Sequence, residues 1–340
     1  MKRIAVLGST GSVGQSALRL IDERRDRLAA VLLSAHSAAD SLCAQAARFG
    51  PEVVCLSSGA DRPPDLPPGV GYESGPEGIV AALEASRPDL VLNAITGAAG
   101  LPASEWTLRR GLPLALANKE SLVMAGPYLM ELSRDTGAAI LPVDSEHCAI
   151  FQCLHREAPE RVRKIYLTGS GGPFRTRPLD QFADITPEQA LRHPTWDMGP
   201  RITIGSATMM NKAFEVLEAH WLFGLAAEQI EVLIHPQSIV HSMVEFVDGN
   251  ILAQLGVPDM RVPILYCLTY PERTPFEFAP FDPVRFAQLT FERPDPRRFP
   301  SLPLAYETLA RGGTAGAVLN AADEVMTARF LAGAVPFPAI

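Results

Sequence analysis

The chain lacks an excess of basic charge and has no long apolar run. Its 340 residues include 30 lysines and arginines against 38 aspartates and glutamates, which gives a net charge of −8 at pH 7. This balance argues against a general nucleic-acid binder, because such proteins usually carry a basic footprint. No apolar stretch approaches the ~18 residues that a membrane span needs. We therefore expect neither a nucleic acid nor a membrane as partner.

Cysteine is scarce as well. The five cysteines contain no C-x-x-C pair, and they are Cys43, Cys55, Cys148, Cys153 and Cys267. An odd number in a chain of this size favours a reduced, cytoplasmic setting over a disulfide framework. The start at Lys2–Leu7 is similar to a signal peptide, but Gly8–Ser12 break the apolar stretch, so export is not expected.

Apolar residues are plentiful, and in the first part of the chain they alternate between two patterns. They make up 47% of the chain against 20% charged residues, enough for packed cores. Short apolar runs predict six strands, at 2–7, 29–35, 52–56, 89–95, 112–117 and 138–143. Segments with helical spacing separate them, at 16–25, 41–49, 79–86 and 122–134. This alternation predicts an α/β fold with a parallel sheet covered on both faces. Residues 57–78, rich in Gly, Pro and Asp, are expected to form a surface excursion.

The second part of the chain has a different organisation. We expect a strand at 162–168, one long helix at 207–223 and a hairpin of strands 239–246 and 251–255. Residues 271–300 hold many prolines and suggest an extended linker, followed by helices at 302–310 and 315–330. The predicted domains are 1–137 for nucleotide binding, 138–270 for catalysis, the linker 271–300, and a C-terminal helical segment 301–340. The chain stops at Ile340 without an obvious closing element, so we expect this last domain to be incomplete.

A glycine-rich turn follows the first predicted strand. Gly8, Gly11 and Gly14 have the spacing G-x-x-G-x-x-G, and glycines there let a pyrophosphate approach the backbone at a helix N-terminus. The alternative is an ordinary turn, because the commoner dinucleotide motif is G-x-G-x-x-G. At the end of the second strand, His36 and Ser37 stand where an NAD site usually has a carboxylate. With no carboxylate to repel a 2′-phosphate, NADP is favoured.

Two acids follow the sixth predicted strand. In an extended chain, Asp144 and Glu146 would point to the same side, with Ser145 and His147 on the other. Paired carboxylates at the carboxyl end of a parallel sheet suit a hard cation such as Mg²⁺ or Mn²⁺. The alternative is a helix N-terminus that favours acidic residues.

A third carboxylate comes from the predicted helix 207–223. At 100° per residue, Asn211, Lys212 and Glu215 share one polar face, separate from the apolar stripe. Ser206 could cap this helix. Such a polar face is usually only solvated, but Glu215 offers the third ligand that the pair of acids needs.

Three further segments contain groups suited to ligand binding. Lys119 lies after the fifth strand, at the edge where α/β proteins bind ligands, although it could be a solvated loop lysine. The loop 169–172 could wrap an anion with its N–H groups or simply be flexible. The segment 193–199 could form a lid, with His193 as an alternative helix-ending residue. Cys148 beside these acids is better explained as structural than as a nucleophile.

Six segments together resemble one family. They are 8–14 (GSTGSVG), 117–121 (ANKES), 141–147 (LPVDSEH), 167–174 (LTGSGGPF), 206–212 (SATMMNK) and 234–238 (IHPQS). In this order they are similar to the 1-deoxy-D-xylulose 5-phosphate reductoisomerases, over essentially the whole chain. The resemblance implies isomerisation and NADPH-dependent reduction of that substrate to 2-C-methyl-D-erythritol 4-phosphate, in non-mevalonate isoprenoid synthesis. It also implies a homodimer, inhibition by fosmidomycin-type hydroxamates, and a Rossmann-like N-terminal domain before an α+β catalytic domain.

The resemblance also assigns residues. The metal, Mg²⁺ or Mn²⁺ with Co²⁺ as a further option, would bind to Asp144, Glu146 and Glu215. The sugar phosphate would contact Lys119, Ser145, Glu146, Ser170, His193, Trp196, Met198, Ser206, Asn211, Lys212 and Glu215. NADPH would contact Gly8, Thr10, Gly11, Ser12, Val13, His36, Ser37, Asn118, Glu120 and Gly199. The catalytic set would be Lys119, Asp144, Glu146, His193 and Glu215.

The chain departs from this family in three places. Many members have a basic residue or Asn after the second strand, where this chain has His36, Ser37 and Ala38, and Pro200 stands where a basic residue is frequent. Members also continue for several tens of residues beyond the position of Ile340.

Two rival functions stay open. One is an NADP-dependent dehydrogenase without isomerisation, which would need no metal. The other is a non-catalytic NADPH sensor, which would have lost some of the acids, Lys119 or His193.

Overall fold

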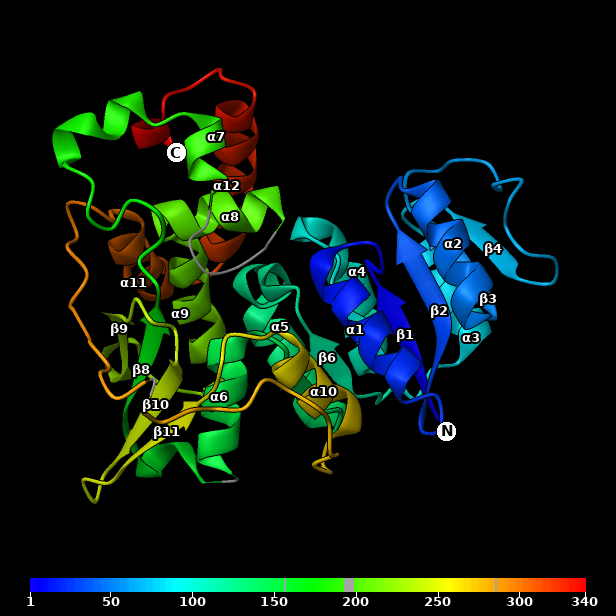
Figure 1. The fold of residues 1–340 in the computed structure, drawn as a ribbon, viewed down its shortest axis with the longest axis horizontal. Helices are drawn as coiled ribbons and strands as arrows, with labels where there is room; N and C mark the ends of the chain where they lie inside the picture. The colour runs from blue at the N-terminus through cyan, green and yellow to red at the C-terminus, as the bar shows by residue number, and fades with distance from the viewer. Residues whose placement is uncertain (156, 193–198, 285) are drawn as a thin grey trace. The chain divides into compact units, whose positions relative to one another are not determined.

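The structure is a computed structural model that describes residues 1–155, 157–192, 199–284 and 286–340. Its contacts divide the chain into two compact units. The first consists of Met1–Ser121, Pro127–Asp144 and Met260–Phe276. The second consists of Leu122–Gly126, Ser145–Asp259 and Glu277–Ile340. Figure 1 shows the helices and strands of both units by their labels.

The first unit is built on a parallel sheet of seven strands in the order β4-β3-β2-β1-β5-β6-β7. The strands are β1 (Lys2–Leu7), β2 (Leu28–Ala35), β3 (Val53–Leu56), β4 (Gly71–Ser74), β5 (Leu90–Asn93), β6 (Leu114–Leu116) and β7 (Ile140–Pro142). The six expected strands are confirmed. The seventh, β4, lies inside the stretch expected to be only a surface excursion, where it pairs with β3 at the edge of the sheet. That expectation was wrong because a short polar strand between glycines has no apolar period to reveal it.

Helices connect the strands of this sheet. They are α1 (Ser12–Glu23), α2 (Ala39–Phe49), α3 (Gly78–Ser86), α4 (Leu101–Arg109) and α5 (Lys119–Thr136), together with α10 (Arg261–Thr269) from later in the chain. The sequence interpretation missed α4. Since parallel crossovers are right-handed, α1 and α2 cover one face while α3 and α4 cover the other. The direction of winding reverses between β1 and β5, and such a switch point is where open α/β sheets bind ligands.

Helix α5 is not continuous. Ala125 has non-helical dihedrals (φ −137°, ψ 29°), and Pro127 follows inside the helix. A proline removes a backbone donor and clashes with the preceding turn, which accounts for the kink. Residues 122–126 group with the second unit, and a side chain at Gly126 would collide with Trp221, its Cβ lying 2.3 Å from the indole.

The second unit contains a four-stranded sheet in the order β11-β10-β8-β9. Its strands are β8 (Val162–Gly169), β9 (Ile230–Ile234), β10 (Val240–Phe246) and β11 (Ile251–Leu255). The predicted hairpin is confirmed: β10 and β11 pair antiparallel, and Gly249 in their turn has a φ of 87°. Buried residues of β8 and β9 form one apolar core with α9, so the sheet supports the helix that carries Glu215.

The helices of the second unit are α6 (Ser145–Leu154), α7 (Pro187–Ala190), α8 (Pro200–Thr208), α9 (Met210–Phe223), α11 (Ser301–Arg311) and α12 (Ala315–Leu331). Over the two units, short 3₁₀ turns lie at Gly97–Gly100, Pro159–Arg161, Leu179–Asp184, Ala227–Gln229 and Phe337–Ala339. The predicted helices near 302–310 and 315–330 are confirmed by α11 and α12. The proline-rich stretch is tied to the sheet, since Glu292 and Ile234 exchange backbone hydrogen bonds of 2.9 and 2.8 Å.

One expected helix is in fact two. The interpretation of 207–223 as a single helix was wrong, because the backbone turns left-handed at Met209 (φ 61°) between α8 and α9. The Met210 N–H turns to the Thr208 hydroxyl (3.3 Å). Ser206 therefore lies in the last turn of α8 and does not cap α9. No glycine or proline marks this break in the sequence.

Within the described part of the chain, none of the helices is both long and apolar enough to cross a membrane. All five cysteines are free thiols.

Candidate active site

The glycine-rich turn connects β1 to α1 at the switch point of the first unit. Gly8 has a φ of 74°, and a Cβ there would lie 2.5 Å from the carbonyl oxygen of Ala94, which follows β5. A Cβ at Gly14 would lie 2.3 Å from the Gly8 carbonyl. Both positions therefore require glycine. Thr10, Gly11, Ser12 and Val13, all expected to contact the cofactor, occupy this turn and the first residues of α1.

The end of β2 presents two exposed polar residues, His36 and Ser37. The Nδ1 of His36 lies 3.0 Å from the hydroxyl of Ser57, which follows β3. The strand end itself has no carboxylate, so nothing at this point of β2 would repel a nucleotide 2′-phosphate.

Asn118 and Glu120 are buried after β6 and hold the loop that follows β5. The Asn118 amide donates to the carbonyls of Ile95 (2.6 Å) and Gly97 (2.9 Å), and the Gly97 N–H donates to Glu120 (3.1 Å). A Cβ at Gly100 would lie 2.6 Å from the Asn118 amide. These two predicted cofactor residues therefore shape the backbone at the carboxyl edge of the sheet.

Lys119, the first residue of α5, pairs with Asp144, which follows β7 in the first unit. Both side chains are largely removed from solvent. Lys119 is therefore not a solvated loop lysine, which was the alternative interpretation of the sequence. An ammonium held beside a carboxylate can supply a proton or stabilise negative charge that develops on a substrate oxygen.

The second unit brings Glu146, Lys212 and Glu215 together. The Lys212 ammonium donates to Glu146 of α6 (2.7 Å), to Glu215 of α9 (2.5 Å) and to the Thr168 carbonyl (2.5 Å). Its side chain is 4% exposed. Burial alone would lower the pKa of Lys212, but the two carboxylates outweigh burial and hold the pKa above its ordinary value. The lysine therefore stays charged and balances one buried acid, Glu215, and one partly buried acid, Glu146.

Asp144 completes an acidic group. Its peptide bond leads directly into Ser145, the first residue of α6, so the chain itself keeps Asp144 beside the first turn. Single carboxylate oxygens of Asp144, Glu146 and Glu215 lie within 4.8 Å of one another. Three carboxylates at this spacing fit a hard divalent cation.

The geometric reason given for the acidic pair was wrong, although the pair does converge. Residues 145–154 are helical, so Asp144 and Glu146 do not alternate along an extended strand. Glu146 stands in the first turn of α6, as the alternative interpretation had it, and it reaches the same region from there. The Ser145 hydroxyl donates to Glu146 (2.5 Å).

The glycine loop after β8 packs against the helices that carry the other predicted substrate residues. A Cβ at Gly172 (φ 65°) would lie 2.6 Å from the Ser206 carbonyl, and one at Gly169 would lie 2.9 Å from Cε of Lys212. Ser170 accepts a hydrogen bond from the Gly172 N–H (3.2 Å). Asn211 donates to Glu215 (2.6 Å). The glycine loop therefore lies against the end of α8 at Ser206 and against Lys212 of α9.

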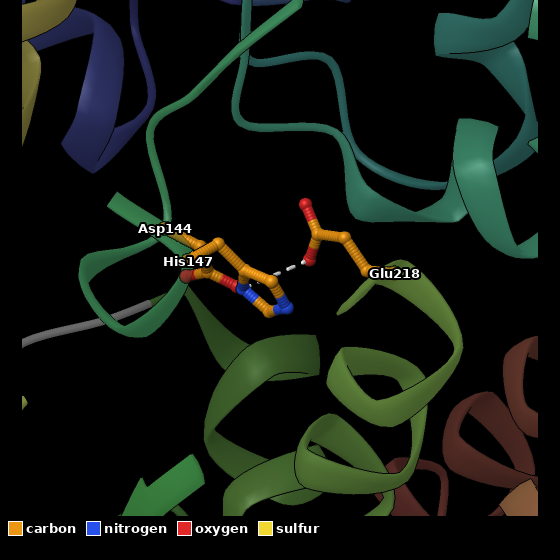
Figure 2. Close-up of side chains that lie close together, drawn as sticks. All are labelled: Asp144, His147 and Glu218. Atoms are coloured by element: carbon orange, nitrogen blue, oxygen red, sulfur yellow. Dashed lines mark ion pairs between the residues drawn. The ribbon is translucent and has the colours of Figure 1, made fainter. Parts of the chain in front are cut away.

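A buried histidine–glutamate pair supports the acidic group, and the sequence interpretation missed it (Figure 2). His147 Nδ1 lies 3.4 Å from Glu218, and the two side chains are 0% and 1% exposed. His147 Nε2 donates to the Glu215 carbonyl (2.9 Å). With Asp144 this pair forms a second group of possible ligands. One signal was present: Glu218 lies one helical turn after Glu215, on a helix that is otherwise mostly apolar.

Two further buried histidines, His235 and His241, were given no role by the sequence interpretation. His241 is buried, which lowers its pKa despite the opposing charge of nearby Glu146. His235 accepts hydrogen bonds from the Ile239 and Val240 N–H groups (both 3.1 Å) and donates to the Thr290 carbonyl (2.8 Å). His235 therefore holds the turn before β10 and ties it to the proline-rich stretch.

Three predicted substrate residues, His193, Trp196 and Met198, lie outside the described residues. Gly199 lies within them and is the N-cap of α8, where its carbonyl accepts from the Thr203 N–H (3.0 Å) and hydroxyl (2.9 Å).

A glycine turn at the switch point of a parallel sheet places the first unit in the class of dinucleotide-binding α/β proteins. Three family models match the chain. They are described as 1-deoxy-D-xylulose 5-phosphate reductoisomerase (residues 4–126), its C-terminal domain (140–223) and DXP reductoisomerase C-terminal domain (255–340). The chain belongs to the 1-deoxy-D-xylulose 5-phosphate reductoisomerase family.

Individual relatives agree with this assignment. The reductoisomerase of Anaeromyxobacter dehalogenans is 50% identical over 100% of this chain and 88% of its own length. That of Paraburkholderia xenovorans is 49% identical over 100% of this chain and 86% of its own. A DOX-P reductoisomerase solved with NADPH, fosmidomycin and magnesium superposes with a TM-score of 0.93 at 39% identity, covering 99% and 86% of the two chains. The Zymomonas mobilis enzyme solved with NADPH superposes with a TM-score of 0.91 at 43% identity, covering 99% of this chain and 88% of its own.

Proposed function

We propose that this protein converts 1-deoxy-D-xylulose 5-phosphate into 2-C-methyl-D-erythritol 4-phosphate, using NADPH and a divalent cation. Membership in the reductoisomerase family supports the reaction, and relatives solved with NADPH, fosmidomycin and magnesium support the cofactors. The observation that carries the proposal is the convergence of Asp144, Glu146 and Glu215 on one region.

The three carboxylates would hold the cation, Mg²⁺ or Mn²⁺. When bound, such a cation supplies Lewis-acid polarisation of a substrate carbonyl. Lys119 stands beside Asp144, where its ammonium stabilises negative charge on a substrate oxygen or holds the proton that this oxygen takes up. Buried His147 fixes the Glu215 backbone and so keeps that carboxylate in place.

The phosphate of the substrate would lie among Ser170, Ser206, Asn211 and Lys212. Two hydroxyls, an amide and a charged ammonium are donors that suit a phosphate dianion. In this interpretation Lys212 redistributes its hydrogen bonds, from Glu146 and Glu215 towards the phosphate, once the cation balances the acids. A phosphate far from the reacting carbons contributes binding energy that orients the substrate.

NADPH would bind at the switch point, with its pyrophosphate against the turn Gly8–Val13 and its 2′-phosphate near His36 and Ser37. Asn118, Glu120 and Gly199 complete the proposed cofactor site. His193, Trp196 and Met198, which lie outside the described residues, are proposed to contact the substrate.

We further propose that the chain works as a homodimer in the cytoplasm. Strand β11 stands at the end of the four-stranded sheet and exposes Ile251 (54%), Leu252 (49%) and Leu255 (41%). An edge strand with apolar side chains pairs readily with a second copy. Sedimentation should show a dimer for the wild type and a monomer for the Leu252→Lys variant, whereas a dimer unaffected by this change would exclude β11 as the contact.

The direct test is NADPH oxidation with 1-deoxy-D-xylulose 5-phosphate, with and without Mg²⁺, followed by identification of the product. Turnover that EDTA abolishes and Mg²⁺ restores, with the branched product, is expected. Metal-independent reduction of an unrearranged substrate would favour a simple dehydrogenase. NADPH binding without any turnover would favour a sensor.

A further inference from the structure

Ser9, the second residue of the glycine turn, is clamped by a glutamine from another helix. The Ser9 hydroxyl donates to Oε1 of Gln45 (2.6 Å), and Nε2 of Gln45 donates back to the Ser9 carbonyl (2.9 Å). The Ser9 carbonyl can only accept, so the orientation of the amide is fixed. Gln45 lies on α2, 36 residues along the chain from Ser9.

The opposite side of the turn is held by β2. The Ser34 carbonyl accepts from the Ser9 N–H (2.8 Å) and lies 3.1 Å from the Ser9 hydroxyl, whose single proton goes to the nearer oxygen of Gln45. The Ser34 hydroxyl accepts from the Gly8 N–H (3.1 Å). Ser9 is fully buried. Its side chain therefore does not face a ligand. It fixes the backbone of the turn, and the neighbouring residues of that turn are the ones that face the ligand.

Gln45 is not needed to hold α2 in place. The helix is anchored by the buried side chains of Leu42, Cys43 and Ala46, whereas Gln45 is only half-buried. Its two hydrogen bonds go to the turn. Glycine-rich backbone loses more conformational entropy on ordering than any other, so a turn with glycines at 8 and 11 depends on such external restraints.

We propose that Gln45 is a positioning residue for NADPH: by clamping both polar groups of Ser9, it keeps the turn shaped so that the N–H groups at the start of α1 face the pyrophosphate. The inference deepens the proposed function and rests on its cofactor. The amide of Gln45 suits this role, because its oxygen accepts from the hydroxyl while its NH₂ group donates to the carbonyl.

Three variants test the clamp. Gln45→Met keeps the length of the side chain and removes both hydrogen bonds. Gln45→Glu keeps an acceptor for the hydroxyl but sets a carboxylate against the Ser9 carbonyl, so it should be worse. Ser9→Ala removes only the hydroxyl. Ser41→Ala, an exposed change on the same helix, is the matched control.

NADPH affinity is measured on the full chain without sugar phosphate, from nicotinamide fluorescence, and steady-state constants are measured alongside. We expect Gln45→Met to weaken NADPH binding roughly fivefold to thirtyfold, the loss of one or two hydrogen bonds. The kcat at saturating NADPH and the KM for sugar phosphate should stay within about twofold, because only cofactor binding is affected. The Ser9→Ala/Gln45→Met double variant should lose less NADPH binding free energy than the two single variants lose together.

Unchanged NADPH affinity in Gln45→Met and Ser9→Ala would overturn the proposal. The proposal would also fail if both KM values and kcat changed together while the melting temperature fell. That result would mark a merely structural role for Gln45. A wild type that binds NADPH but does not turn over the sugar phosphate would refute the proposed reaction while the clamp is still judged by binding. A wild type that does not bind NADPH would refute both.

Discussion

The ammonium of Lys212 lies 2.7 Å from the carboxylate of Glu146, a residue 66 positions earlier in the chain. The same ammonium contacts Glu215 one helical turn along α9. This contact brings α6 and α9 together at the point where the proposed cation and phosphate sites adjoin. The charge balance of the site therefore depends on both carboxylates and the ammonium together.

Glu215→Gln should reduce turnover by more than about 100-fold, because an amide replaces a carboxylate ligand of the Lewis acid. NADPH affinity should be unchanged, because Glu215 is not among the residues proposed to contact NADPH. Steady-state kinetics and cofactor titration measure the two effects. Exposed Glu228 supplies the control, Glu228→Gln. A Glu215→Gln enzyme with near-normal turnover would show that this residue is not a metal ligand.

Lys212→Met should destabilise the metal-free protein by about 3–5 kcal/mol, because it removes the ammonium that balances the buried carboxylate of Glu215 and the partly buried one of Glu146. Mg²⁺ should recover part of that loss in the variant and stabilise the wild type less. The measurement is urea unfolding with EDTA and with Mg²⁺. Lys164→Met, which removes a partly exposed pair with Glu231, should cost less than about 1 kcal/mol. Equal costs for the two lysines would contradict the proposed charge balance.

Acidification should weaken the fold through His235. Burial lowers the pKa of His235, although its hydrogen bond to Thr290 opposes the shift. The unfolded chain titrates near ~6.5, so below that pH it binds more protons than the folded chain. The stability contributed by neutral His235 is thus fully present above ~6.5 and is lost as the pH falls towards the lower folded value.

The check is the unfolding free energy of the wild type and of His235→Gln, measured from neutral pH downwards. The variant should be less stable at neutral pH, and its stability should fall less steeply on acidification. His155→Gln, at an exposed position, should follow the wild type. Parallel curves for His235→Gln and the wild type would remove His235 as a source of the acid sensitivity.

Gly172→Ala should raise the KM for sugar phosphate. The new methyl group would lie 2.6 Å from the Ser206 carbonyl and would force the glycine loop away from α8. Gly249→Ala is the matched control, because it has a φ of 87° but nothing within 4 Å of its Cβ. Both changes carry a left-handed backbone cost of ~1–2 kcal/mol, so both should lower stability. If both also raised the KM alike, the close approach of the loop to Ser206 would be irrelevant to binding.

The sequence was informative where one physical pattern dominates. Six strands of the parallel sheet were predictable because strands buried on both faces are continuous apolar runs. The polar strand β4 and the break at Met209 were not, since neither has an apolar period or a glycine or proline signal. The face shared by Lys212 and Glu215 followed from helical geometry. The contacts of His147 with Glu215 and Glu218 depend on how α6 packs against α9, which no local pattern encodes.

Titration of Mn²⁺ into the metal-free protein tests the central claim most directly. We expect one Mn²⁺ per chain, bound at least about tenfold more weakly in Asp144→Asn, Glu146→Gln and Glu215→Gln, and at wild-type affinity in Glu228→Gln. Undiminished Mn²⁺ affinity in all three site variants would show that the ion binds elsewhere, and the account of the acidic group would be wrong.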